Sequence, residues 1–550
     1  MPPEMALAPP AQAVFLTGFM GTGKSTTGAR LAERLQLPFV DTDVVVCDLA
    51  GQSIPDVFAR EGEERFRALE TEALQRAIAA GPAVIATGGG AMLRPGNVEL
   101  MRAAGPIICL HASAETILRR TAKRGGRPLL EGGDPMRRIT DLLRERQPHY
   151  ARADYQVSAE GSDRELTLSR LVEVLSADRR SRLLVVKEVR VSVNAGAQTY
   201  PVHVAQGAYG NLGRLCPAPE AGTACAVVST DRIAPLYAAT VMEALRSGGW
   251  APTLMTVPDG ERSKTLQTVS CLYDRLVAAG VDGAGAVFAL GGGVAGDVAG
   301  FVAATYRRGV RFAQLPTSLL AQVDAGVGGK VAVDHPAGKN LVGTFYHPAA
   351  VVIDSATLRT LPERELRSGL AEVIKHGAIA DAAMFEYLEQ RLGEFRGLRA
   401  SAVLYILGRN CQIKAGFVAQ DPLDRGMRAC LNYGHTIGHA VERAAGDWGL
   451  AHGEAVAVGM LAEARLGAAL GITSEAVVAR LEALLQAAGL PTRAPGVDAE
   501  VAREALLKDK KIAAGRLRLP VVSEVGKVEL LSDVDPELVC SALEEAVGAG

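Results

Sequence analysis

The sequence lacks several features that would assign it to a specialised class of protein. Its 550 residues include eight cysteines that form no C-x-x-C pair, so we expect reduced thiols and no thiolate metal site. No run approaches the ~20 uninterrupted apolar residues of a membrane helix, and the start lacks the basic and apolar regions of a secretory signal. The formal net charge of −2 gives no sign of a nucleic-acid partner. These absences favour a soluble, cytoplasmic enzyme acting on small molecules.

The length predicts three or four compact units, at roughly 100–200 residues per domain. A basic and polar stretch, Asp178-Arg-Arg-Ser-Arg182, interrupts the apolar pattern and indicates a solvated connector. The alternating stretch Glu188-Val-Arg-Val-Ser-Val-Asn194 predicts a hairpin of strands after it. We expect a disordered lead-in at 1–12, a P-loop unit at 13–176, a linker at 177–184, a second α/β unit at 185–355 and a mainly helical unit at 356–550.

A phosphate-binding loop is the clearest motif of the first unit. The apolar run Ala13–Thr17 leads into Gly18-Phe-Met-Gly-Thr-Gly-Lys-Ser-Thr26, which fits G-x-x-x-x-G-K-[ST] between a strand and a helix. Backbone N–H groups of such a loop surround a phosphate chain, its lysine meets the β- and γ-phosphates, and its serine is placed for Mg²⁺. The predicted ATP-binding residues are Gly21, Thr22, Gly23, Lys24, Ser25 and Thr26, with Ser25 at Mg²⁺.

The rest of this unit carries residues suited to a small acidic acceptor. Asp41 and Asp43 follow a predicted strand, Arg67 and Glu70 share one helical face, and the run Gly88-Gly-Gly90 leaves bare backbone that a ligand can approach. With Arg146-Gln-Pro-His-Tyr150, these pieces resemble shikimate kinase, a parallel sheet with helices on both faces. The resemblance implies that shikimate is held by Asp43, Arg67, Gly89 and Arg146. It also implies that Asp43 orients the attacking hydroxyl and that Arg127, in Arg124-Gly-Gly-Arg127, closes over the phosphoryl group.

A second glycine-rich turn predicts a dinucleotide site in the next unit. The run Ala286–Leu290 enters Gly291-Gly-Gly-Val-Ala-Gly296-Asp297, which fits G-x-G-x-x-G between a strand and a helix. Asp231 follows another strand, where an acidic side chain can reach a ribose. A basic cluster around Arg308, Lys330 and Lys339 suits a phosphorylated acid better than a plain alcohol.

Histidines cluster further along the chain. Three of the nine lie in Leu431-Asn-Tyr-Gly-His435-Thr-Ile-Gly-His439 and the following Ala451-His452-Gly-Glu454. His435 and His439 are four apart and so share a helical face, and an upstream helix with Glu372 offers a carboxylate ligand. The glutamate of H-E-x-x-H is missing, which disfavours a metalloprotease. Spacing alone does not decide which of these side chains bind a metal.

The segments around Gly291, Asp324, Lys339, Glu372, His435 and His452, in this order, resemble 3-dehydroquinate synthase. The resemblance implies Glu372, His435 and His452 as zinc ligands, with Co²⁺ as a possible substitute, and His439, Lys330 and Lys375 as catalytic residues. It implies an NAD site at Asp231, Glu261, Lys264, Gly292, Gly293, Val294, Asp297, Thr317, Ser318, Lys330 and Lys339. The implied sugar-phosphate site comprises Arg308, Asp324, Lys330, Asn340, Lys375, Lys414, Arg428, Asn432, His439 and Lys510.

Together the two resemblances predict a bifunctional shikimate-pathway enzyme that works as a homodimer through its second half. In the resembled family, NAD takes up and returns a hydride while zinc polarises the carbinol oxygen, and 3-deoxy-arabino-heptulosonate 7-phosphate becomes 3-dehydroquinate and orthophosphate. Two alternatives stay open from the sequence. The second half could be another sugar-phosphate cyclase or a polyol dehydrogenase, and the first half a nucleotide-sensing module without kinase activity.

Overall fold

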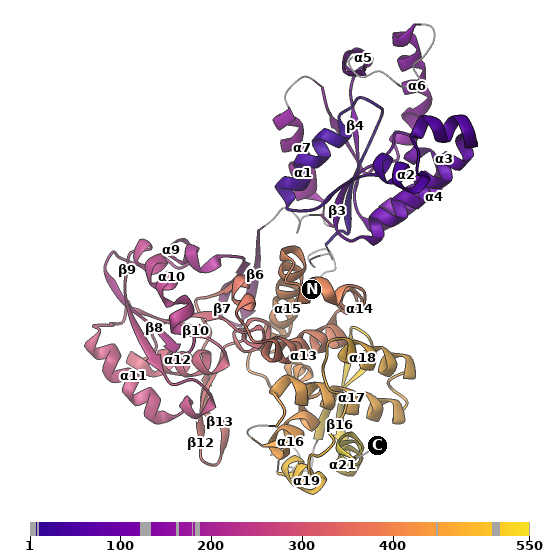
Figure 1. Cartoon of the computed structure of the whole chain (residues 1–550). Coiled ribbons are helices and arrows are strands. Elements are labelled where there is room, and N and C mark those ends of the chain that lie inside the picture. The colour runs from indigo at the N-terminus through magenta and orange to yellow at the C-terminus, as the bar shows by residue number, and fades with distance from the viewer. Residues whose placement is uncertain are drawn as a thin grey trace. The chain divides into compact units, whose positions relative to one another are not determined.

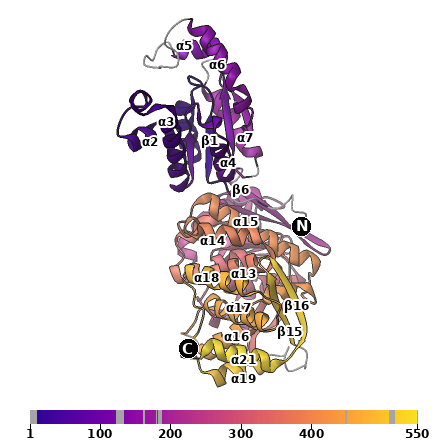
Figure 2. The ribbon, with the colours of Figure 1, turned by 90° about the vertical axis from the view of Figure 1, so that its right-hand side faces the viewer.

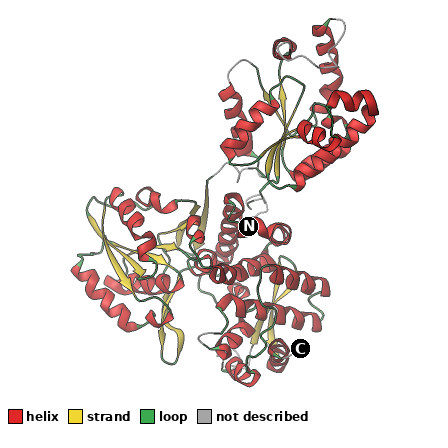
Figure 3. Ribbon diagram, in the orientation of Figure 1, coloured by secondary structure: helices red, strands yellow, loops and turns green. Residues whose placement is uncertain are grey.

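The computed structural model of the chain divides into two compact units, Ala8–Lys187 and Glu188–Gly550 with Met1–Leu7 (Figures 1 and 3). It describes residues 7, 10–121, 134–160, 164–178, 180–181, 187–446, 449–508 and 517–548. In these ranges no helix has both the length and the apolar character needed to cross a membrane.

The first unit is built on a parallel five-stranded sheet in the order β2-β3-β1-β4-β5. Its strands are β1 (Ala13–Thr17), β2 (Phe39–Asp41), β3 (Ala83–Ala86), β4 (Ile107–His111) and β5 (Tyr155–Ser158). Its helices are α1 (Lys24–Leu35), α2 (Thr42–Ala50), α3 (Ile54–Ala79), α4 (Pro95–Ala104), α5 (Ala114–Thr121), α6 (Pro135–Tyr150) and α7 (Arg164–Ala177), and the short 3₁₀ turn η2 spans Ala91–Leu93.

Both faces of this sheet are covered, as predicted. Val14 and Leu16 of β1 pack in one core cluster with residues of α1 and α7, and Phe15 packs in another with residues of α3, α4 and α6. Strands buried on both faces read as continuous apolar runs, which is why residues 13–16 show no alternation. The strand order reverses beside β1, so the loop after β1 opens into the crevice where ligands bind in such sheets.

Hydrogen bonds connect the inner ends of the expected lead-in and connector to the first unit. Ala11 N–H donates to the Arg180 carbonyl at 2.7 Å, so the chain is already part of the first unit before residue 13. In the connector, the buried Asp178 carboxylate accepts from the backbone N–H groups of Arg180 and Ser181. Tyr155 also donates to Asp178 at 3.0 Å. The described residues of this stretch, Asp178, Arg180 and Ser181, thus form a turn that packs against this unit.

The second unit begins with the predicted hairpin, which joins a seven-stranded sheet in the order β6-β7-β14-β11-β10-β8-β9. Only the β6–β7 pair in this sheet is antiparallel. The strands are β6 (Glu188–Ala195), β7 (Gln198–Ala205), β8 (Thr223–Thr230), β9 (Trp250–Val257), β10 (Ala286–Gly291), β11 (Arg311–Pro316) and β14 (Ala350–Asp354). Strand order reverses at β8 and β10, so a ligand crevice is expected beyond their carboxyl ends.

Helices and a separate hairpin complete this α/β part (Figure 1). The helices are α9 (Leu212–Leu215), α10 (Ala234–Ser247), α11 (Leu266–Ala278) and α12 (Gly293–Thr305), and the hairpin joins β12 (Lys330–His335) to β13 (Gly338–Phe345). Short helical turns are η4 (Ala208–Asn211), η5 (Glu261–Ser263), η6 (Tyr306–Arg308), η7 (Ala321–Ala325) and η8 (Ser355–Arg359). Residues of α10 pack on one face of the sheet and residues of α11 and α12 on the other.

The remainder is mainly helical, as predicted, with one unexpected hairpin (Figure 2). Its helices are α13 (Glu363–Ala380), α14 (Ala382–Arg396), α15 (Ala400–Gln420), α16 (His435–Ala445), α17 (His452–Ala469), α18 (Glu475–Ala487), α19 (Ala499–Leu507) and α21 (Pro536–Val547), and η9 spans Met427–Asn432. The antiparallel pair β15 (Leu517–Glu524) and β16 (Lys527–Val534) packs beside α17.

Glycines let α16 and α17 approach at backbone distance. A Cβ at Gly459 would lie 2.0 Å from the Gly434 carbonyl oxygen and 2.7 Å from the Gly438 nitrogen. Gly434 precedes α16 with φ 79°, in the left-handed region that favours glycine. From α17, the buried Glu463 carboxylate accepts from Gly434 N–H at 2.6 Å and from Ile437 N–H at 3.3 Å. These contacts fix the first turn of α16 against α17.

Gly459→Ala should therefore destabilise the second unit. The added methyl would overlap backbone, which cannot yield as a side-chain end does, so we expect a loss of about 3 kcal/mol or more. Calorimetric unfolding of the whole chain measures this loss. The control is Gly393→Ala, since Gly393 is exposed on α14 and has open space at Cβ. It should gain about 0.5–1 kcal/mol from helix propensity, and equal behaviour of the two variants would contradict the packing argument.

Candidate active sites

The phosphate loop between β1 and α1 has the predicted geometry. Gly21 and Gly23 have φ of 79° and 95°, which turn the loop back toward the start of α1. The Lys24 ammonium donates to the Gly18 carbonyl at 2.9 Å and to the Phe19 carbonyl at 3.2 Å. The whole predicted ATP set lines a cavity of about 1150 Å³, namely Gly21, Thr22, Gly23, Lys24, Ser25 and Thr26.

Bare backbone at Gly88–Gly90 forms one wall of the same cavity. A Cβ at Gly90 would lie 1.8 Å from an Arg67 guanidinium nitrogen. A Cβ at Gly88 would lie 2.6 Å from Glu70 Oε1 and 2.8 Å from Asp43 Oδ1. These side chains therefore lie directly against glycine, in space that any larger residue would fill.

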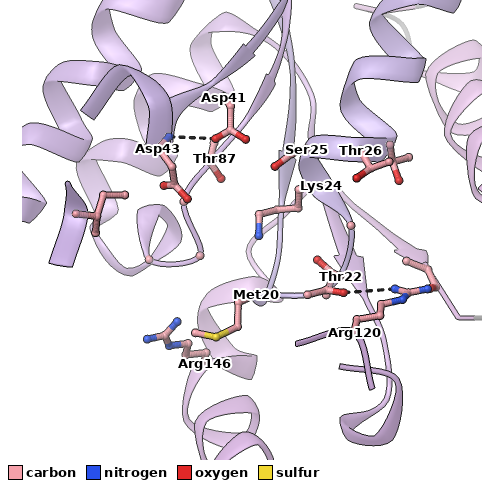
Figure 4. Close-up of a pocket in the computed structure, with 18 of the residues that line it drawn as sticks. Met20, Thr22, Lys24, Ser25, Thr26, Asp41, Asp43, Thr87, Arg120 and Arg146 are labelled. Atoms are coloured by element: carbon pink, nitrogen blue, oxygen red, sulfur yellow. Dashed lines mark hydrogen bonds between the residues drawn. The ribbon is translucent and has the colours of Figure 1, made fainter. Parts of the chain in front are cut away.

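Charged groups of both signs converge on this wall (Figure 4). Arg67 pairs with Glu70 at 3.0 Å and with Glu63 at 3.0 Å, and Arg146 is buried over the Phe19 ring at 5.7 Å. Beside it, the Tyr150 hydroxyl donates to the Gly89 carbonyl at 2.7 Å. The structure thus brings together Asp43, Arg67, Gly89 and Arg146, the four predicted acceptor residues, whereas Arg127 lies outside the described residues.

Sequence reasoning left Glu70 out of the site, although it noted the helical spacing of Glu70 from Arg67. The Glu70 side chain is buried, and its Oε1 has no hydrogen-bond partner among the described residues. Burial raises the pKa of this carboxyl, while the Arg67 guanidinium acts in the opposite direction. Arg120 was also missed, and it lines the cavity and donates to the Ala159 carbonyl at 2.9 Å.

Glycine backbone also follows β10 in the second unit, at the strand ends where the reversed strand order predicts a ligand crevice. β10 ends at Gly291, α12 begins at Gly293, and Thr317 N–H donates to the Gly291 carbonyl at 2.9 Å. Asp231 follows β8 and accepts from Asp259 N–H at 3.0 Å. The predicted NAD residues at these strand and helix ends are Asp231, Gly292, Gly293, Val294, Asp297, Thr317 and Ser318.

A buried lysine joins this crevice to the hairpin. The Lys264 ammonium lies 3.0 Å from Asp297 and 3.3 Å from Glu261, and it donates to the Asn340 side-chain oxygen at 2.6 Å. Burial raises the pKa of Asp297 to about 6, although Lys264 acts in the opposite direction. Asn340 was predicted to bind the sugar phosphate. In the structure its side chain bonds to a predicted NAD residue.

Two other predicted phosphate contacts lie on exposed positions. Lys330 begins β12 and pairs with Asp424. Arg308 is exposed in η6, at the opposite end of α12 from the glycine turn. Lys510 lies outside the described residues, so the structure does not place it. Among the described residues, the predicted set for the sugar phosphate is therefore only partly brought together.

Three helices bring the predicted metal ligands together. Glu372 of α13 is fully buried, and its Oε1 lies 3.4 Å from His435 Nε2 and 3.7 Å from His452 Nε2. The rings of His435 and His439 lie 5.1 Å apart, and those of His435 and His452 lie 5.4 Å apart. Among the described residues, His439 also forms a possible ligand set with the other two histidines. Geometry thus gives two candidate triads that share His435 and His452, while Asp324, Glu372 and His376 form a further group of possible ligands in the described residues.

The second nitrogens of the two shared histidines are already engaged. His435 Nδ1 donates to the Tyr433 carbonyl at 3.2 Å, and His452 Nδ1 donates to Glu442 Oε2 at 2.9 Å, because both of these oxygens only accept. Each Nε2 therefore faces Glu372. Neither Glu372 oxygen has a hydrogen-bond partner among the described residues, although Lys375 forms an ion pair with it. A buried carboxylate with two oriented imidazoles fits a catalytic zinc or cobalt ion.

The electrostatics of the cluster agree with that fit. Burial alone would raise the pKa of Glu372, but Lys375 and His435 hold it well below its usual range. Burial and Lys375 lower the pKa of His435, so it stays neutral. Burial also acts to lower the pKa of His452, but the neighbouring Glu372 and Glu442 carboxylates raise it to about 10. A metal at His452 would thus displace a proton.

Cationic side chains surround this cluster. Lys414 of α15 pairs with Asp324 of η7, and Lys375 lies next to Glu372 on α13. Burial lowers the pKa of Lys414 to about 8, while Asp324 acts in the opposite direction. Arg428 donates to the Gly328 carbonyl at 3.0 Å, and η9 ends at Asn432, three residues before His435. The predicted substrate residues near the metal ligands are Asp324, Lys375, Lys414, Arg428, Asn432 and His439.

Fold and sites define a two-centre α/β enzyme, with a P-loop phosphotransfer centre in one unit and a combined dinucleotide and metal centre in the other. Residues 20–176 match the family model for shikimate kinase. Residues 254–368 and 369–512 match the models for the N-terminal and C-terminal parts of 3-dehydroquinate synthase.

Individual relatives agree with the family models. The 3-dehydroquinate synthase of Desulforamulus reducens is 44% identical over 356 residues, covering 64% of this chain and 99% of that protein. A solved 2-deoxy-scyllo-inosose synthase with carbaglucose-6-phosphate, NAD⁺ and Co²⁺ has a TM-score of 0.59 and 26% identity, covering 65% of this chain and 100% of its own. The 2-epi-5-epi-valiolone synthase of Streptomyces hygroscopicus, with NAD⁺ and Zn²⁺ bound, has a TM-score of 0.57 and 29% identity, covering 65% and 99%. The chain belongs to the 3-dehydroquinate synthase family and carries a shikimate kinase domain ahead of it.

The two candidate triads are separable by metal affinity. If Glu372, His435 and His452 are the ligands, Glu372→Gln should weaken Zn²⁺ binding by more than the about 10–100-fold typical of losing an outer-shell partner. His439→Ala should bind Zn²⁺ nearly as wild type does. Competition of the metal-stripped chain with a chromophoric chelator measures both. The opposite ranking would assign the metal to the three histidines.

Proposed function

We propose that the chain catalyses two reactions of aromatic amino acid biosynthesis. The first unit phosphorylates the 3-hydroxyl of shikimate with ATP and Mg²⁺. The second converts 3-deoxy-arabino-heptulosonate 7-phosphate to 3-dehydroquinate and orthophosphate with NAD and a divalent metal. The observation that carries the proposal is the presence of both centres in one chain. The P-loop and the glycine wall at Gly88–Gly90 lie in the unit that matches shikimate kinase. The glycine turn at Gly291 and the Glu372 cluster lie in the unit that matches 3-dehydroquinate synthase.

In the kinase centre, the residues position the two substrates and neutralise their negative charges, and they take little part in covalent chemistry. Lys24 and the loop N–H groups hold the phosphate chain, and Ser25 is placed for Mg²⁺. Arg67 and Arg146 present forked donors that match a planar carboxylate. Asp43, against Gly88, accepts from the attacking hydroxyl and orients it. Glu70 fixes Arg67 through their ion pair and offers Oε1 to a substrate hydroxyl.

In the synthase centre, Glu372, His435 and His452 would hold the zinc, and the crevice from Asp231 to Ser318 would hold NAD. A zinc ion there supplies Lewis acidity toward a substrate oxygen, and NAD supplies reversible oxidation of a carbinol. His439, an exposed residue of α16 beside the metal ligands, is the group that moves a proton. Lys375, Lys414 and Arg428 hold the carboxylate and hydroxyls, and Lys330 takes the phosphate with the other basic residues.

The alternatives from the sequence are less well supported. The cyclases of known structure that resemble the second unit act on other substrates by their names, at 26% and 29% identity. The synthase relative is 44% identical over nearly its full length, which favours 3-dehydroquinate synthase. The complete acceptor wall disfavours a purely nucleotide-sensing first unit. We further propose that the chain acts as a homodimer in the cytoplasm, without a nucleic-acid partner.

Measurements of orthophosphate release and ADP formation test the two activities on the whole chain. Metal-stripped protein with NAD⁺ and the heptulosonate phosphate should release orthophosphate only after Zn²⁺ is added, without net NADH, because the oxidation is reversed within the cycle. Shikimate should support ADP formation from ATP and Mg²⁺ in the same preparation. Zinc-independent release, or NADH accumulation with a polyol, would contradict the synthase assignment, and the absence of shikimate-dependent ADP would contradict the kinase assignment.

Arg67→Lys should raise the KM for shikimate by about 10–100-fold, because an ammonium cannot replace a forked, charge-assisted pair of hydrogen bonds. The KM for ATP should change little, since Arg67 lies on the acceptor wall. Coupled ADP assays measure both constants. The matched control is Arg65→Lys on the same helix, where Arg65 is exposed and pairs only with Glu61 at 3.4 Å among the ion pairs of the described chain. A similar KM for shikimate in the two variants would remove Arg67 from the site.

A further inference from the structure

Glu442 lies between the metal cluster and the hairpin, and neither proposed activity has given it a role. It follows His435 by seven residues and His439 by three on α16, so all three share one helical face. Its Oε2 accepts from His452 Nδ1 at 2.9 Å. Its Oε1 lies 3.5 Å from the Lys339 ammonium of β13. One carboxylate therefore contacts a predicted metal ligand and a residue of the hairpin.

Asn340, the next residue of the hairpin, is hydrogen-bonded to Lys264 at the predicted dinucleotide site. Asn340 accepts from Lys264, whose ammonium also lies 3.0 Å from Asp297 at the start of α12. Asn340 N–H donates to Asp334 Oδ1 at 2.8 Å, and Asp334 N–H donates to the Lys264 carbonyl at 2.7 Å. The hairpin at this point is bonded on one side to the crevice and on the other to Glu442.

We propose that Glu442 is a positioning residue that orients His452 for the metal and, through Lys339, makes divalent-metal and dinucleotide binding favour one another. This inference rests on the proposed NAD and metal sites of the second unit. The hydrogen bond from Nδ1 keeps the Nε2 lone pair of His452 directed at the cluster. The ion pair with Lys339 holds the Glu442 carboxylate toward His452 when the hairpin contacts the dinucleotide site. A bound dinucleotide favours that position of the hairpin. Coupling between two sites is reciprocal, so the metal strengthens dinucleotide binding by the same factor.

The test measures Zn²⁺ affinity of the metal-stripped full chain by chelator competition, without and with saturating NAD⁺, and needs no turnover. In wild type, NAD⁺ should strengthen Zn²⁺ binding within the roughly 5–150-fold range of such couplings. Glu442→Ala should weaken Zn²⁺ binding about 10–100-fold and lose the NAD⁺ effect. Glu442→Gln should restore most of the Zn²⁺ affinity, because its amide oxygen accepts from Nδ1, but not the NAD⁺ effect, because it carries no charge for Lys339.

A matched control is Glu454→Gln, two residues from His452 on α17, where the carboxylate pairs with Arg364 at 2.7 Å. It should keep the NAD⁺ effect. Lys339→Met should keep the Zn²⁺ affinity measured without NAD⁺ and lose the effect at saturating NAD⁺. A merely structural Glu442 would give equal Zn²⁺ affinities in the Ala and Gln variants, with both weakened by the same loss of fold.

Three outcomes would overturn the inference. One is wild-type Zn²⁺ affinity in the folded Glu442→Ala variant, and the second is an NAD⁺ effect that survives in Glu442→Gln. The third is a wild-type chain that binds NAD⁺ and releases orthophosphate but shows no NAD⁺ effect on Zn²⁺, which rejects the coupling while the proposed function stands. A chain that binds no NAD⁺ by titration calorimetry would contradict the proposed function as well.

Discussion

The fully buried Glu372 carboxylate is the constraint on which the second unit depends. A charge removed from water is tolerated only with compensating partners. Here the partners come from three helices: Lys375, three residues after Glu372 on α13, His435 on α16 and His452 on α17. The first turns of α16 and α17 and the middle of α13 must therefore meet at the Glu372 carboxylate. The glycine contact between α16 and α17 and the Glu463 bonds to the start of α16 are what hold two of them there.

The two centres bind anionic ligands with different kinds of groups. In the first unit, the loop after β1 offers main-chain donors and a single lysine, and the acceptor wall is glycine backbone bordered by Arg67, Glu70 and Arg146. In the second unit, basic side chains come from distant parts of the chain and are neutralised internally, as in the pairs Lys414–Asp324 and Lys264–Asp297. A ligand entering that centre exchanges partners with groups that are already paired, so selectivity arises from geometry as much as from charge.

Much of the fold and part of each site could be predicted from sequence. The P-loop and the turn at Gly291 each combine a glycine-rich turn with a preceding apolar strand, and these local patterns predicted the α/β fold of both units. Glu70, Glu442 and Glu463 escaped because a glutamate in a helix is usually solvated, and their burial depends on partners far along the chain. The place of Asn340, which was predicted to bind the sugar phosphate, also depended on the hairpin, which brings its side chain to Lys264. The assignments of individual ligands stay predictions.

The glycine wall of the first unit has a consequence for how its acceptor site could change over time. Because Gly88 and Gly90 leave no room for a Cβ beside Asp43, Glu70 and Arg67, the volume offered to the acceptor is set on this side by the main chain. Substitution there cannot trim or enlarge the recess by degrees, since the first methyl already occupies it. New acceptor preferences in such a scaffold would have to arise from the side chains that α3 and α6 bring to the glycines, such as Arg67, Glu70 and Arg146.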